Sequence, residues 1–101
     1  TAMGWYLDGR VSAMVGTHTH IPTADERVLP KGSGYISDVG MTGTYESVIG
    51  MNTDKALLRF VSKLPEKMEA ASGPGTLCAV LLDIDPDSGR CQGIKRVKIA
   101  E

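Results

Sequence analysis

The sequence contains little cysteine, few aromatic residues and no excess of charge of either sign. Its 101 residues include two Cys, one Trp and one Phe, and 11 Lys and Arg nearly balance 12 Asp and Glu, leaving a formal charge of −1. Neither Cys belongs to a C-x-x-C motif and one pair makes no disulfide framework, so we expect a reduced, cytoplasmic setting. Proteins that bind nucleic acid specifically usually carry an excess of basic residues, and this chain has none, so we expect no specific nucleic-acid binding.

Long hydrophobic runs are also missing. The longest, Leu77–Leu82, is far shorter than the about 20 residues that a membrane-spanning helix needs, and it is typical of a buried strand. Thr1–Gly9 has neither the basic region nor the long apolar core of a signal peptide. We therefore expect no membrane partner. Because the chain opens on Thr1 rather than Met, we expect it to be trimmed from a longer protein.

What is present is typical of one α/β domain over residues 1–101, with enough hydrophobic residues (42%) for a modest core. Apolar periodicity predicts helices over 2–7 and 52–64 and strands over 11–15, 27–29, 35–39, 76–85 and 92–99. Gly9 is expected to end the first helix, and Asn52 is a cap-type residue at the start of the second. The turn residues Pro86–Gly89 are expected to join the last two strands into a β-hairpin. Cys78 is expected to be a core residue that Cys91 faces across this hairpin. Apolar residues at helical spacing predict that one face of the second helix packs into the core: Ala56, Leu57, Phe60, Val61 and Leu64.

The only two histidines, His18 and His20, stand two residues apart just after a predicted strand. On an extended segment such side chains project to the same side, so both imidazoles could reach one metal or a bridged pair. The ends of strands are also where open α/β sheets place their sites. On spacing alone, metal ligands and exposed loop histidines remain equally open.

The surrounding motifs carry a resemblance. Gly16–His20, Thr23–Arg27 and Asp38–Gly50, with Tyr6–Arg10 before them, closely resemble the YmdB-like bacterial metallophosphoesterases of the calcineurin-like superfamily. The resemblance is sharp over residues 6–50. Beyond Gly50 it is one of layout, with a helix, a proline and a C-terminal hairpin.

This resemblance implies the C-terminal part of an αββα sandwich that ends in a β-hairpin. It also implies a metal-dependent phosphodiesterase that hydrolyses phosphodiesters such as 2′,3′-cyclic nucleotides at two metal ions, Fe or Mn. The family's last metal motif maps onto His18 and His20, each expected to hold one ion. The family's earlier motifs, including its catalytic histidine, have no counterpart in this sequence. We therefore expect about two-fifths of an enzyme, with no catalytic residue of its own and no activity alone.

Other residues near the histidines complete the expected site only in part. A catalytic metal needs about three protein ligands, and no third histidine exists. Asp25 and Glu26 stand beside Arg27 and are expected to form a solvated turn. Asp38, at a strand end, is expected to have a structural role or to support the ligands, rather than to bind a metal itself. A glycine-rich loop is expected to wall the site and let a phosphate approach its backbone: Gly40, Met41, Thr42 and Gly43.

Two other functions fit the sequence. The chain could be a non-catalytic interaction module in which the histidine pair is incidental and the hairpin serves oligomerisation. It could also be a small metal-binding protein that completes its ligand shell in a symmetric dimer. If the phosphoesterase interpretation holds, the uncovered sheet edge and apolar face should make the chain bind its missing N-terminal half or form a homo-oligomer.

Overall fold

The computed structural model describes all 101 residues and has the predicted order of elements. These are α1 (Ala2–Leu7), β1 (Ala13–Val15), β2 (Arg27–Val28), β3 (Gly34–Ile36), α2 (Thr53–Ser62), β4 (Thr76–Ile84) and β5 (Cys91–Ala100). Strand β3 ends at Ile36, three residues earlier than predicted. The reason is that the next two backbone N–H groups donate to side chains, Ser37 to Asp25 and Asp38 to Thr23, instead of to a neighbouring strand.

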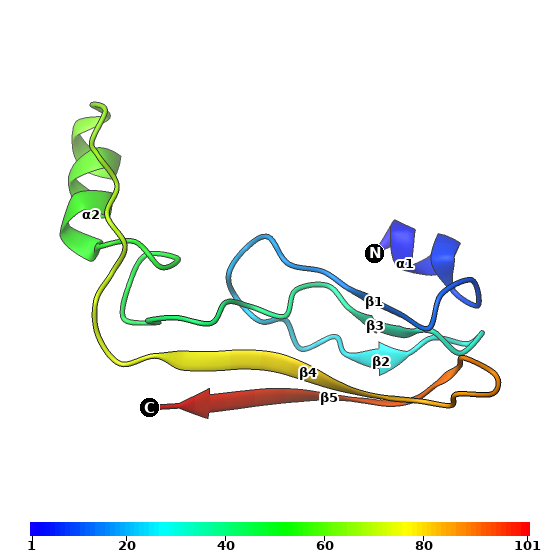
Figure 1. The fold of residues 1–101 in the computed structure, drawn as a ribbon. Helices are drawn as coiled ribbons and strands as arrows, with labels where there is room; N and C mark the ends of the chain where they lie inside the picture. The colour runs from blue at the N-terminus through cyan, green and yellow to red at the C-terminus, as the bar shows by residue number, and fades with distance from the viewer.

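The strands form two layers. Strand β3 lies at the centre of a three-stranded sheet, parallel to β1 and antiparallel to β2, while β4 and β5 form the long antiparallel hairpin. Figure 1 shows the small sheet lying over the hairpin, with β2 and β3 against β5. Gly34 permits this approach, because a Cβ at that position would come within 2.8 Å of Cys91 Sγ. The mixed α/β architecture and the C-terminal hairpin are as predicted.

The hairpin corrects one expectation about the cysteines. Cys78 pairs with Lys98 and Cys91 pairs with Ile84, so the two thiols do not face each other, and both are free and buried. The hairpin turn lies between Asp85 and Arg90, where Asp85 N donates to the Arg90 carbonyl. A turn at this position pairs Cys78 with a residue later in the chain than Cys91. Within the turn, the Asp85 carboxylate accepts from Ser88 Oγ at 2.6 Å, and this hydrogen bond lowers the pKa of Asp85.

The structure is open, with a smaller core than its composition suggests. Its accessible surface is 6986 Å², against about 5,500 Å² for a compact protein of this mass. Its radius of gyration is 17.1 Å, against about 13 Å for a compact 100-residue domain. Only 13 of the 101 residues are buried. The buried hydrophobic residues are Leu29, Tyr35, Ile36, Cys78 and Cys91.

Helix α2 departs most from expectation. Asn52 caps it as predicted, with its side-chain oxygen accepting from Lys55 N at 3.1 Å, and Lys63 ends it in the left-handed conformation. The helix nevertheless buries none of its residues and stands away from both sheets (Figure 1). The expectation that its apolar face packs into the core of this chain is therefore wrong: Phe60 is 79% exposed.

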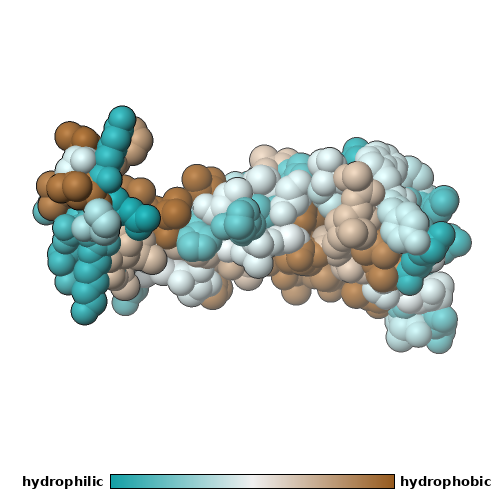
Figure 2. Space-filling view, turned by 90° about the horizontal axis from the view of Figure 1, so that it is seen from above, coloured by the Kyte–Doolittle hydropathy of each residue, from teal (hydrophilic) through white to brown (hydrophobic).

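Much apolar surface is exposed elsewhere as well. Figure 2 shows hydrophobic residues gathered over α2 and again over the part of the molecule that contains α1 and β1. Helix α1 presents Met3, Trp5 and Tyr6 to solvent, each more than half exposed. Extensive exposed apolar surface of this kind marks sites of interaction with other molecules. No helix of the structure is long and apolar enough to cross a membrane.

The difference in side-chain exposure predicts a large loss of stability for one substitution by alanine in residues 1–101 and almost none for another. Ile36→Ala should lower the free energy of unfolding by about 2–5 kcal/mol, because Ile36 is fully buried and its loss leaves a cavity. Phe60→Ala should change it by no more than about 0.5 kcal/mol, because the ring is already in solvent. Urea unfolding of the two variants provides the measurement. A larger loss for Phe60→Ala would mean that α2 packs against the body after all.

Candidate functional site

His18 and His20 lie in the loop that leaves the carboxyl end of β1. The chain bends through residues 18–21, and His20 has a positive φ of 67°. The histidines are therefore not on an extended segment, and the expectation of an extended backbone there is wrong. In this bent segment His18 is exposed and His20 is half-buried.

Asp38 fixes the shape of this loop. Its Oδ2 accepts from the backbone N–H of His18 at 2.9 Å, from that of Thr19 at 2.7 Å and from Thr19 Oγ1 at 2.8 Å. Its Oδ1 accepts from Gly40 N at 2.8 Å. The Thr19 backbone bond, aided by the others and opposed by burial, lowers the pKa of Asp38 to about 2. Asp38 is 3% exposed and has the structural role predicted for it.

The imidazole of His20 is held by a backbone carbonyl. Its Nδ1 lies 2.7 Å from the carbonyl oxygen of Ile49. Because a carbonyl can only accept, Nδ1 carries the proton in this contact, and the neutral ring then keeps a free lone pair on Nε2. Metal-binding histidines are commonly held in this way, with one ring nitrogen donating to a carbonyl or carboxylate and the other facing the metal.

A hollow of about 470 Å³ opens beside His20. Its lining is mostly apolar and comprises His20, Ile21, Met41, Tyr45, Ser47, Val48 and Ile49. Among the four residues predicted to wall the site, only Met41 lines this hollow. The other three lie elsewhere: Gly40 donates to Asp38, Gly43 pairs with Thr76 of β4, and Thr42 is exposed.

Tyr45 anchors that loop, a role that the sequence analysis missed. Its hydroxyl accepts from Met41 N at 3.1 Å and lies 3.0 Å from the Met41 carbonyl and 3.1 Å from Cys78 Sγ. Burial, together with the Cys78 thiol, raises the pKa of Tyr45. A lone tyrosine in a glycine-rich loop was the available signal, because a buried phenol needs polar partners.

No third metal ligand joins the histidines within this chain. The structure contains no group of three His, Cys, Asp or Glu side chains that could hold a metal ion. The prediction that Asp25 lies in a solvated turn is wrong. Its carboxylate accepts hydrogen bonds from Thr23 Oγ1, at 2.5 Å, and from Ser37. Burial raises the pKa of Asp25, but the bonds from Ser37 and Thr23 outweigh it and the net pKa is lowered.

Glu26 also differs from expectation. Its carboxylate pairs with Arg96 of β5 at 2.9 Å instead of with the adjacent Arg27, and the hydrogen bond from Arg96 lowers the pKa of Glu26. Arg27 lies instead over the Trp5 ring, 5.0 Å from its centroid. Asp25 and Glu26 therefore support the loop, and neither forms a three-ligand group with the histidines.

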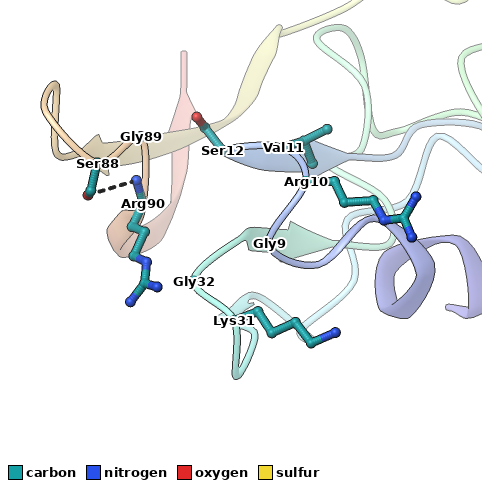
Figure 3. A pocket seen from close by; sticks show the side chains of 9 residues that line it. All are labelled: Gly9, Arg10, Val11, Ser12, Lys31, Gly32, Ser88, Gly89 and Arg90. Atoms are coloured by element: carbon teal, nitrogen blue, oxygen red, sulfur yellow. Dashed lines mark hydrogen bonds between the residues drawn. The ribbon is translucent and has the colours of Figure 1, made fainter.

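A second hollow, of about 500 Å³, lies at the amino end of β1, opposite to the histidines. Three turns form it, and they contribute Arg10, Lys31 and Arg90 but no acidic side chain (Figure 3). The Arg10 guanidinium lies 4.6 Å from the centroid of the Tyr6 ring. Figure 3 shows Arg90 pointing away from the other two cations. The three charges do not converge on one ligand, so we place the site at the histidines.

Comparison with known proteins identifies the family of the chain. The family model described as YmdB-like protein matches residues 1–97. The chain belongs to the YmdB-like family. It is 50% identical, over 98 residues, to a Bacillus subtilis (strain 168) protein named 2′,3′-cyclic-nucleotide 2′-phosphodiesterase. That alignment covers 97% of this chain but 37% of the relative.

Two solved structures share the fold. A hypothetical protein from Thermus thermophilus superimposes with a TM-score of 0.94 at 45% identity, over 99% of this chain and 39% of its own. A novel phosphatase from Mycoplasma pneumoniae superimposes with a TM-score of 0.92 at 35% identity. The match covers 98% of this chain and 36% of the phosphatase. The chain thus spans little more than a third of the length of the relatives that it matches, and the family and fold class predicted from the sequence are confirmed.

Proposed function

We propose that this YmdB-like chain is the C-terminal part of a metal-dependent phosphodiesterase whose substrates are small phosphodiesters such as 2′,3′-cyclic nucleotides. Support comes from the name of the Bacillus subtilis relative and from the phosphatase among the structural neighbours. The observation that carries the proposal is the His20 contact. The Ile49 carbonyl occupies Nδ1 and leaves Nε2 available as a ligand, which an incidental loop histidine does not require.

In this proposal His18 and His20 contribute ligands to a centre of two metal ions, Fe or Mn. Two imidazoles without a third donor match a partial shell, so further ligands must come from outside residues 1–101. Two such ions, when bound, would polarise the phosphate and activate water for in-line attack. The chain's own residues position the ligands: Asp38 holds the backbone of the His18–His20 loop, and Tyr45 holds the loop that walls the hollow.

The free edge of β1 is where the missing N-terminal half would attach. Strand β1 pairs with β3 on one side only, and the pairing is parallel. Parallel strands are normally buried within larger sheets with both faces covered. The exposed apolar residues of neighbouring α1 extend the same surface. We therefore expect residues 1–101, made alone, to bind that half or to self-associate as a homo-oligomer through this edge.

The proposal is tested by comparing the full-length protein with residues 1–101. The full-length protein should bind metal and hydrolyse a 2′,3′-cyclic nucleotide, and it should lose that activity on chelation and regain it with Mn²⁺. Residues 1–101 should be inactive in excess Mn²⁺, because the remaining ligands and a proton donor are absent. The measurements are metal content by mass spectrometry and product formation by chromatography. Activity that survives complete metal removal, or turnover by residues 1–101 alone, would contradict the proposal.

A further inference from the structure

The segment that contacts His20 is a tight turn of an unusual composition. Val48 and Met51 exchange two backbone hydrogen bonds, at 3.0 Å from Val48 N and 2.9 Å from Met51 N. The two residues between them both have positive φ, 48° at Ile49 and 93° at Gly50. Positive φ at both central positions defines a type I′ turn.

Isoleucine is a poor choice for the first central position of this turn. Type I′ turns strongly prefer Asn, Asp or Gly there, because a side chain branched at Cβ collides with the backbone when φ is positive. Three residues other than glycine have positive φ in the whole chain: His20, Ile49 and Lys63. Lys63 ends α2, where the left-handed conformation is common. The other two are hydrogen-bonded to each other.

The turn does not depend on His20 for its shape. Ser47 Oγ accepts from Gly50 N at 2.9 Å and donates to the Thr44 carbonyl at 2.5 Å, which ties the turn to the preceding loop. On the other side, Ala71 N donates to the Gly50 carbonyl at 2.8 Å. The Ile49 carbonyl is therefore fixed from both flanks. Strained residues held by their surroundings in this way are concentrated at functional sites.

We infer that the type I′ turn Val48–Met51 is the positioning element of His20, with Ile49 as the positioning residue. Its carbonyl holds the proton on Nδ1 and sets the plane of the ring, so that the Nε2 lone pair is presented to a metal ion. The Ile49 side chain meanwhile lines the hollow beside His20, a position that the Asn usual in such turns would make polar. This inference rests on the proposed metal-dependent function, but the turn and its contact are properties of this chain alone.

Two proline substitutions separate this role from a general structural one. Ile49→Pro forces φ to about −65°, which the turn cannot accept, and so displaces the carbonyl. Lys63→Pro makes the same change at the other left-handed residue, whose φ is 58°, away from the site. Ile49→Asn is the conservative variant, because Asn keeps the type I′ turn and its carbonyl.

The variants are made in the full-length protein and read out by Mn²⁺ affinity and by the tautomer of His20. Ile49→Pro should weaken Mn²⁺ binding about 10–100-fold, the usual cost of losing a partner of a metal-binding histidine. Ile49→Asn and Lys63→Pro should stay within about 2-fold of the original, since neither displaces that partner. In metal-free protein labelled with ¹⁵N-histidine, at a pH where imidazole is neutral, the His20 signal, assigned by its loss in His20→Ala, should be that of the Nδ1–H form.

Each contrary result has a distinct meaning. An Nε2–H tautomer for His20 in the unmodified protein would overturn the inference even if Ile49→Pro does not fold. Unchanged Mn²⁺ affinity in folded Ile49→Pro, or an equal loss in Lys63→Pro, would also overturn it while leaving the proposed function intact. Unchanged affinity in His20→Ala would instead overturn the metal site itself, and the positioning role with it.

Discussion

His20→Ala in the full-length protein should lower phosphodiesterase turnover by at least about 100-fold and remove bound metal, while the fold is retained. Even the loss of a residue behind a ligand costs about 10–100-fold, so the loss of the ligand itself should cost no less. The stability effect should be no more than about 1 kcal/mol, because the half-buried ring makes one hydrogen bond, to Ile49. His18→Ala should lower turnover and bound metal in the same way, because His18 is the other proposed ligand. Its effect on stability should also be small, because the His18 side chain is exposed.

Measurement of this effect requires turnover, metal content and a thermal melt for the same preparation of each variant. Thr17→Ala is the matched control, because Thr17 is an exposed neighbour in the same loop and should leave all three unchanged. If His20→Ala unfolds the chain, but the molecules that stay folded keep their metal and their turnover, then the histidine is structural. That result would contradict the role of His20 as a metal ligand.

Asp38→Asn should be the most destabilising polar substitution in the loop region, costing about 3 kcal/mol. The carboxylate accepts four hydrogen bonds, and an amide in its place keeps one acceptor oxygen and turns a donor toward the remaining N–H groups. With the loop released, both histidines lose their support, so metal affinity should fall together with stability. Asp87→Asn is the control, because Asp87 is an exposed acid in the β4–β5 turn.

The same residue should dominate the acid sensitivity of this region. The pKa of Asp38 is about 2 in the folded chain, below the ordinary 3.8 that applies on unfolding. A depressed folded pKa means that the stabilisation is fully present above about pH 4 and is lost as pH falls toward 2. Urea unfolding at a series of pH values should therefore give a steep decline in this window for the original protein. The difference between it and Asp38→Asn should shrink over the same window, and a constant difference would contradict the assignment.

Local patterns predicted the helices and strands of this fold well, because the residues that start, end or turn each element lie within it or next to it in the sequence. Asn52 caps α2 as expected, Gly9 turns with a φ of 80°, and the Pro86–Gly89 cluster closes the hairpin. The surroundings of an element were harder to predict. The apolar face of α2 has a helical period whether it packs into this chain or against another polypeptide, so periodicity alone could not place Phe60 in solvent.

The site was predictable in its residue types but not in its geometry. His18 and His20 were identified as candidate ligands because they are the only imidazoles, and Asp38 was expected to support the site because it lies near the end of a predicted strand. The contact that orients His20 comes from a backbone carbonyl 29 residues away, which no side-chain motif encodes. The one local signal was an isoleucine before Gly50, and it becomes informative only once the turn is seen.

The position of the hairpin in the chain also determines when the site becomes rigid during synthesis. The loops that carry His20 and Tyr45 are made before the strands that brace them, through Tyr45 to Cys78 and Glu26 to Arg96. At about 5–20 residues per second, a ribosome adds Arg96 several seconds after Tyr45, whereas a hairpin closes in about 1–10 μs. A nascent chain therefore displays both histidines on loops that lack their contacts with β4 and β5 until β5 emerges, and any metal loading that needs the finished geometry is confined to the time after that moment.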